Sequence, residues 1–204
     1  MSKIYLDNIN WMGGYYELSM EFNPTGNDIR IHDAMAALIK SDIIHGIWYE
    51  KGSYSKKSIE LPIDLNEFGK TCYVAVEIND YIVDCKVIIT RIEDESDWID
   101  ILISQSVLEK IYSYQYPLLY SLNPWLFKVD HLFITLAKDI FQESPFDFAM
   151  IGEDASGLTN QQELSIQQIY KENFLLPRKL YEKLDLKNEG EKISNELRLY
   201  RFKE

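Results

Sequence analysis

The strongest pattern in the sequence is a run of apolar residues at helical spacing between Asn123 and Ser144. Its members lie three or four positions apart, as on the buried face of a helix. They are Trp125, Val129, Leu132, Leu136 and Ile140. Asn123 followed by Pro124 is typical of a helix start, and Ser144 followed by Pro145 is typical of a helix end. The sequence therefore predicts one long amphipathic helix here.

Short apolar runs on either side of this helix predict strands. Residues 146–151 are apolar enough for a buried strand, and an acidic turn follows from Gly152 to Gly157. Near the start of the chain, residues 15–22 alternate between apolar and polar positions, which predicts a half-buried strand with one face in water. A helix from about Asp28 and a strand over residues 43–49 follow it. The opening therefore predicts a β-α-β unit.

The middle of the chain is rich in strand-forming residues. Residues 71–78, 81–92 and 97–103 are separated by turns of hairpin length and predict an antiparallel meander. A short helix over residues 105–112 and a tyrosine-rich link lead to the long helix. If residues 97–103 and 146–151 share a sheet, the helices between them form a crossover, and the two strands could be parallel.

The last part of the chain carries weaker signals. Thr159 and Gln162 have the spacing of a helix capping box. Leu176 and Pro177 suggest a helix that ends near Leu184, and residues 197–202 suggest a final strand. Together these patterns predict a single α+β domain over residues 1–204, with residues 158–204 either within it or appended to the same core. Its sheet is mixed and mostly antiparallel, with helices packed on at least one face.

Composition places this chain among soluble proteins. It has 204 residues, of which 46% are hydrophobic, and no stretch approaches the roughly twenty apolar residues of a membrane-spanning helix. The first residues lack the apolar core of a signal peptide, so we expect a cytoplasmic protein. Cys72 and Cys85 lie within apolar runs and are expected to be buried free thiols.

The formal net charge of −12 indicates which classes of partner the protein can bind. Such a charge repels phosphate backbones and anionic membranes, so neither nucleic acid nor a membrane is an expected partner. It attracts basic proteins instead. Solubility is the simpler explanation of the charge, because acidic surfaces also keep proteins dispersed.

Catalytic and metal-binding motifs are missing. His32, His45 and His131 do not have a second histidine at helical ligand spacing, and the cysteines do not form a paired motif, so no metal is expected. The serine-hydrolase elbow, the dinucleotide fingerprint and the phosphate loop are also missing, and no cofactor is expected.

One acidic hairpin combines carboxylates with a tryptophan. An interface for a basic protein uses this pairing, because acids steer the approach and aromatic rings anchor the complex. The predicted partner-binding residues are Glu93, Asp94, Glu95, Asp97, Trp98 and Asp100. Solvated turn residues would give the same pattern. The leading hypothesis is a non-enzymatic acidic binding protein that neutralises or regulates a basic protein, most concretely a bacterial toxin-immunity protein.

Two alternatives remain open. Glu153 and Asp154, with His131, could form the site of a small carboxylate-dependent hydrolase near the turn from Gly152 to Gly157. The chain could also be a structural subunit of a bacterial or phage assembly, which would present a broad apolar surface or a symmetric oligomer.

Overall fold

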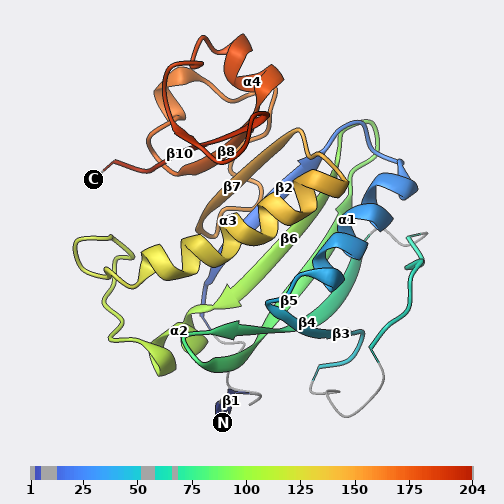
Figure 1. The fold of residues 1–204 in the computed structure, drawn as a ribbon, viewed down its shortest axis with the longest axis vertical. Coiled ribbons are helices and arrows are strands. Elements are labelled where there is room, and N and C mark those ends of the chain that lie inside the picture. The colour runs from blue at the N-terminus through green and yellow to red at the C-terminus, as the bar shows by residue number, and fades with distance from the viewer. Residues whose placement is uncertain (1–2, 6–12, 52–57, 66–68, 204) are drawn as a thin grey trace.

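A ten-stranded, mostly antiparallel sheet runs through the protein (Figure 1). The computed structural model describes residues 3–5, 13–51, 58–65 and 69–203. The strands are β1 (Lys3–Tyr5), β2 (Tyr15–Phe22), β3 (Ile44–Trp48), β4 (Gly69–Ile78), β5 (Tyr81–Arg91), β6 (Asp97–Ser104), β7 (Phe148–Glu153), β8 (Asn173–Pro177), β9 (Glu191–Lys192) and β10 (Leu197–Tyr200). Their order is β3-β4-β5-β6-β2-β7-β8-β10-β9, and β1 pairs in parallel with the start of β5.

Two long helices cover one face of this sheet. α1 (Asp28–Lys40) and α3 (Leu126–Glu143) pack against each other across it (Figure 1). Their apolar stripes are buried in the main core. The shorter helices are α2 (Gln105–Ile111), α4 (Arg178–Lys183) and a 3-10 turn, η2 (Ile166–Gln168). The predicted α+β class is confirmed. Within the described residues, no helix has the length and apolar character needed to cross a membrane.

The long helix is confirmed, but its predicted cap is wrong. α3 begins at Leu126, and the side chain of Asn123 makes no bond to it. The Asn123 amide instead accepts from the backbone N–H of Gln115 and donates to the carbonyl oxygens of Gln115 and Leu119, at 2.7–3.2 Å. Asn123 is fully buried, so its donors and acceptor had to find partners within the protein. It therefore fixes the tyrosine-rich link rather than the helix.

The meander and the short helix after it are confirmed. β4 pairs with β5, and β5 with β6, each antiparallel and in continuous register. Asn79 and Asp80 form the first turn, both with positive φ, which suits a two-residue hairpin. Cys72 and Cys85 lie within these strands as buried free thiols. Burial raises the pKa of the Cys72 thiol to about 11, so this thiol stays protonated.

The prediction that β2 has one face in water is wrong. Glu17 and Glu21 are only 3% and 2% exposed, and Ser19 between them is fully buried. β2 lies at the centre of the sheet between β6 and β7, and later residues cover its second face. Alternating polar residues therefore mark a buried polar layer here.

The two strands joined by the predicted crossover are parallel, as expected, but they are not adjacent in the sheet. β6 and β7 are both antiparallel to β2, so they run parallel to each other with β2 between them. In the same way, the β-α-β unit formed by β2, α1 and β3 is present, with β4, β5 and β6 inserted between its strands. The expected 152–157 turn begins two residues late, because β7 continues to Glu153.

The C-terminal part extends the sheet and adds a second apolar cluster. β8 and β10 pair antiparallel and continue the sheet beyond β7 (Figure 1). Strand β8 was not predicted, and the predicted helix begins after it, at Arg178. The capping box predicted at Thr159 and Gln162 is wrong, and a real one lies at Ser165 and Gln168. The second cluster forms behind β7 and β8, on the face away from α3, and includes Phe148, Met150, Phe174 and Tyr200.

Asp84 is a buried carboxylate that receives no hydrogen bond from the described residues. It lies on β5 on the face away from α1 and α3, is 1% exposed, and neither of its oxygens has a partner within the described part of the chain. Burial disfavours its charged form and raises its pKa to about 7, although Lys51 opposes the shift. The folded protein therefore binds this proton more tightly than the unfolded chain does.

We expect Asp84→Asn to stabilise the protein at pH 8 and to have little effect at pH 4. Between the unfolded pKa near 4 and the folded pKa near 7 the native state holds the extra proton, so the contribution of Asp84 to stability falls as pH rises through this window. The gain at pH 8 should be about 1–3 kcal/mol, since the amide also lacks partners. Urea unfolding at both pH values measures it.

Asp80→Asn is the matched control. Asp80 lies in the adjacent turn, is exposed, and has a positive φ that asparagine tolerates. It should change stability by less than about 0.5 kcal/mol at either pH. An Asp84→Asn variant with no gain at pH 8 would contradict this account.

Candidate binding groove

Residues 155–163, which we call the covering segment, lie over the second face of β2. Glu17 Oε2 accepts from the backbone N–H of Ser156 at 2.9 Å, and Glu21 Oε2 accepts from that of Gln161 at 2.8 Å. The second oxygen of Glu21 accepts from the Ser96 hydroxyl at 2.7 Å. Buried carboxylates require such donors. Glu17 and Glu21 thus hold the covering segment against the sheet.

A groove separates the covering segment from β5 and β6. Its sheet side consists of Ile88 and Thr90 on β5, with Ile92 just beyond, and of Trp98 and Asp100 on β6. Its other wall is formed by residues 156–163. The volume of this part is about 480 Å³, within the range of small-ligand and side-chain pockets.

The groove continues toward the hairpin between β5 and β6. A second hollow of about 230 Å³ shares Glu95, Trp98, Asn160 and Glu163 with the first and adds Glu21 and Asp94. We call both parts together the acidic groove. Among the described residues that line it, every charged side chain is acidic. These residues are Glu21, Asp94, Glu95, Asp100 and Glu163.

Trp98 is the aromatic residue of the acidic groove. Its ring packs edge-on against Phe148, with 6.4 Å between the ring centroids. The residue is half-buried, so one part of the indole is held by the core and another is open to the groove. This is the state in which an aromatic side chain can anchor a partner without rearranging.

Asp100 is the most buried carboxylate that faces the main hollow. It is 6% exposed, and its Oδ1 accepts from the Ser19 hydroxyl at 2.5 Å. Burial raises its pKa to about 7; the Ser19 hydrogen bond opposes this, and the nearby Glu17 carboxylate adds to it. Asp100 therefore changes charge near neutral pH.

Thr159 also lines the main hollow. It is 7% exposed, and none of the residues that the structure describes forms a hydrogen bond with its hydroxyl. Buried hydroxyls almost always have a partner in folded proteins, so this group stands out.

The residues predicted for partner binding fall into three groups. Asp94, Glu95, Trp98 and Asp100 line the acidic groove. Glu93 is exposed in the same hairpin but does not line the groove. Asp97 is turned to the opposite face of the sheet and is 1% exposed.

Asp97 holds the start of α1 against the meander. Its Oδ1 accepts from the Thr25 hydroxyl at 2.7 Å and from Arg91 Nε at 3.0 Å, and its Oδ2 accepts from the backbone N–H of Gly26 at 3.0 Å. Arg91 also pairs with Asp28 at 2.7 Å. Asp97 therefore serves the fold and is not accessible to a partner.

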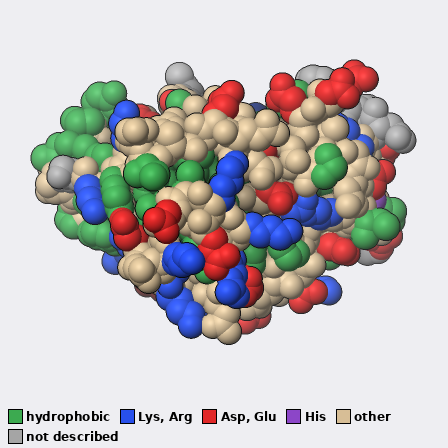
Figure 2. Space-filling view, turned by 90° about the horizontal axis from the view of Figure 1, so that it is seen from above, with side chains coloured by type: hydrophobic (Ala, Val, Ile, Leu, Met, Phe, Trp, Pro, Cys, Tyr) green, Lys and Arg blue, Asp and Glu red, His purple; other side chains and the backbone are tan. Residues whose placement is uncertain are grey.

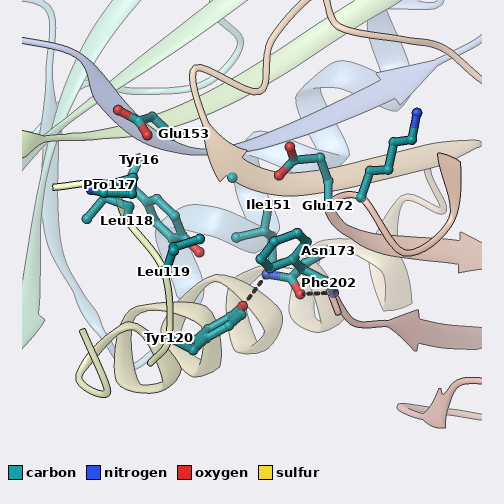
Figure 3. A pocket seen from close by; sticks show the side chains of 12 residues that line it. Tyr16, Pro117, Leu118, Leu119, Tyr120, Ile151, Glu153, Glu172, Asn173 and Phe202 are labelled. Atoms are coloured by element: carbon teal, nitrogen blue, oxygen red, sulfur yellow. Dashed lines mark hydrogen bonds between the residues drawn. The ribbon is translucent and has the colours of Figure 1, made fainter. Parts of the chain in front are cut away.

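The alternative site residues are not assembled in one place. Glu153 lines a separate cavity of about 170 Å³ (Figure 3). Asp154 instead accepts from the backbone N–H of Tyr15 at 3.1 Å and lies in a left-handed turn. His131 is exposed on α3 and does not line that cavity.

Glu153 has a carboxylate neighbour that the sequence did not suggest. Glu172, just before β8, lines the same cavity, and burial together with the charge of Glu153 raises its pKa to about 7 (Figure 3). Glu153 itself accepts from the side-chain amide of Gln105 at 2.6 Å. Glu172 is therefore partly protonated near neutral pH.

Three residues that line this cavity, Tyr16, Tyr120 and Asn173, belong to a hydrogen-bond network centred on Asp130. The buried Asp130 accepts from the Tyr16 hydroxyl at 2.7 Å and from the Tyr120 hydroxyl at 2.5 Å. Asn173 donates to Tyr120 at 2.5 Å and accepts from the backbone N–H of Phe202 at 3.0 Å, as Figure 3 shows. This network fixes the tyrosine-rich link and the last residues to β8.

The surface at the end of the molecule that carries the C-terminal elements has charges of both signs. Viewed from the end that carries the C-terminal elements, Lys and Arg side chains alternate with Asp and Glu (Figure 2). The described residues contain no group of three or more His, Cys, Asp or Glu side chains placed to hold a metal ion.

Sequence reasoning missed Thr159, Glu163 and Glu172. Thr159 was assigned to a helix cap, and the other two lie in stretches without a recognisable period. These residues line cavities only because the covering segment and β8 pack beside distant strands. Local sequence patterns do not predict such long-range packing.

Comparison of the chain with protein-family models, with curated proteins and with solved structures found no match. The interpretation of the site therefore rests on its geometry and chemistry.

We expect Asp97→Asn to destabilise the protein by about 2–3 kcal/mol at pH 7, because a buried carboxylate that pairs with Arg91 and two other donors is lost. The midpoint of urea unfolding measures the change. Asp94→Asn is the control: Asp94 is exposed and has a positive φ, which asparagine tolerates, and it should shift stability by less than about 0.5 kcal/mol. Equal effects of the two variants would contradict a structural role for Asp97.

Proposed function

We propose that this protein is a non-enzymatic binding protein that holds a basic segment of a protein partner in the acidic groove. The observation that carries the proposal is the charge of the groove: five acidic side chains and no basic one among its described lining residues. The acidic side chains would attract a basic segment along the whole groove, and no basic side chain among the described lining residues would repel it.

The acidic groove also has the parts that make an interface specific. Carboxylates at its rim, such as Glu95 and Glu163, are exposed and suited to steering a partner during approach. Trp98 is a partly exposed, well-packed aromatic residue, the type that most often dominates binding energy. On the face shown in Figure 2, by contrast, basic side chains are interspersed with the acidic ones.

The sharpest version of this proposal is an immunity-type protein that neutralises a nuclease toxin in the bacterial cytoplasm. Nucleases present basic surfaces to their substrates, and a protein with net charge −12 can occupy such a surface. This version is supported by acidity, size and the missing catalytic motifs, and it rests on analogy.

A carboxylate-dependent hydrolase is the second candidate. The pair of Glu153 and Glu172 favours it, because a carboxyl whose pKa is about 7 beside a second carboxylate suits acid–base chemistry. Its cavity of about 170 Å³ is small for a substrate, and the predicted partners Asp154 and His131 lie outside it.

The test compares two double variants in a pull-down from native lysate, at low and at moderate salt. We expect the wild type to retain a basic protein, and Glu95→Lys with Glu163→Lys to lose it, because two repulsive charges enter the acidic groove. Partner association should slow by at least about tenfold in stopped-flow measurements at low salt and by less at high salt.

The control carries the same change of net charge elsewhere. Glu109→Lys with Glu143→Lys alters two exposed acids, on α2 and α3, that do not line the acidic groove. It should keep the partner and change the association rate by less than about threefold. Equal loss with both double variants would assign binding to net charge and reject the groove.

A further inference from the structure

We propose that the main hollow of the acidic groove is a specific pocket for one lysine side chain of the partner, whose ammonium group binds between Asp100 and Thr159. This inference rests on the proposed function and adds to it a single anchoring residue of defined chemistry.

Two acceptors in this hollow lack a donor. Oδ1 of Asp100 is taken by the Ser19 hydroxyl, and the second oxygen has no hydrogen-bond partner among the described residues. The hydroxyl of Thr159 has none either. Both residues are more than nine-tenths buried, and the Thr159 hydroxyl is itself a buried polar atom without a partner, so its desolvation is uncompensated among the described residues. A bound donor group would supply what both lack.

The arrangement favours an ammonium over a guanidinium group. A guanidinium gains most from a carboxylate when it binds both oxygens in a fork, and Ser19 already occupies one oxygen of Asp100. An ammonium is a compact charge with three donors that can be directed separately. It therefore has separate donors for the second oxygen of Asp100 and for the Thr159 hydroxyl.

The walls suit the rest of a lysine side chain. Ile88 and Ile92 provide apolar contact for the methylene groups, and Trp98 adds an aromatic surface at which a cation is attracted. The hollow of about 480 Å³ has room for one long side chain and some water.

Charges around Asp100 make binding depend on pH. Four other carboxylates and one lysine surround Asp100. They are Glu17 and Glu21 on β2, Lys86 on β5 near Glu17, and Glu95 and Glu163 at the rim of the groove. With a pKa of about 7, Asp100 is partly protonated in the free protein at neutral pH. An arriving ammonium stabilises the carboxylate and lowers this pKa, so binding expels a proton. Affinity for lysine should therefore rise as pH increases through about 7.

The experiment uses calorimetric titration of the full chain with oligolysine and oligoarginine peptides of equal length. We expect oligolysine to bind about tenfold more tightly than oligoarginine at pH 8. Its binding should release protons at pH 7, visible as a heat that changes with the ionisation enthalpy of the buffer. The advantage of oligolysine should shrink at pH 6.

Three variants test which residues are responsible for oligolysine binding. Asp100→Asn should weaken oligolysine binding about tenfold and abolish the proton release. Thr159→Val keeps the shape of the side chain, removes an unpaired hydroxyl and should weaken oligolysine binding about threefold without loss of stability. Asp84→Asn is the matched control, because Asp84 is also a buried carboxylate with a pKa of about 7 and lies on the same face of the sheet as Asp100, but it does not line the acidic groove.

The outcomes separate this inference from the function on which it rests. If both peptides bind equally and Asp100→Asn acts no differently from Asp84→Asn, the lysine pocket is overturned while the acidic groove remains a binding site. If neither peptide binds the wild-type protein, the function proposed for the groove fails as well. Thermal unfolding of each variant shows whether a loss of binding reflects a loss of fold.

Discussion

The burial of Glu17 and Glu21 in the central strand is the constraint on which the second face of this protein depends. A carboxylate at the middle of a sheet cannot reach water, and leaving it without donors would cost several kcal/mol. The donors come from the backbone of residues 156 and 161 and from Ser96. The chain must therefore return across β2 after β7, and the second apolar cluster forms where it does so.

The groove exists because the covering segment extends over β2 but not over β5 and β6. The covering segment is held over β2 and leaves the outward side chains of β5 and β6 open beside it. Asp100 and Thr159 both line the groove at this boundary, the first from the sheet and the second from the covering segment. The same hydrogen bonds that stabilise the fold thus set the position of both walls, so a ligand meets a site whose backbone is already fixed.

Sequence alone predicted the parts of the fold that depend on near neighbours. The meander and the helices follow from local periodicity and turn residues, and they are present. The wet face assigned to β2 was wrong because alternation reports polarity and not exposure. The backbone donors that help make burial of Glu17 and Glu21 tolerable lie about 140 positions later in the chain. β8 was missed for a related reason, since five residues ending in proline resemble a helix start until a partner strand is known.

The acidic hairpin illustrates why a cluster in sequence is not a cluster in space. Successive strand residues point to opposite faces, so Asp97 lies with α1 while Trp98 and Asp100 lie with the covering segment. Asp97 accepts four hydrogen bonds and becomes a structural link, whereas Asp100 accepts one and retains a free oxygen. Two carboxylates three positions apart therefore have different environments. A carboxylate can bind a partner only where the fold leaves one of its oxygens without a donor. The net charge of the protein does not show which carboxylate that is.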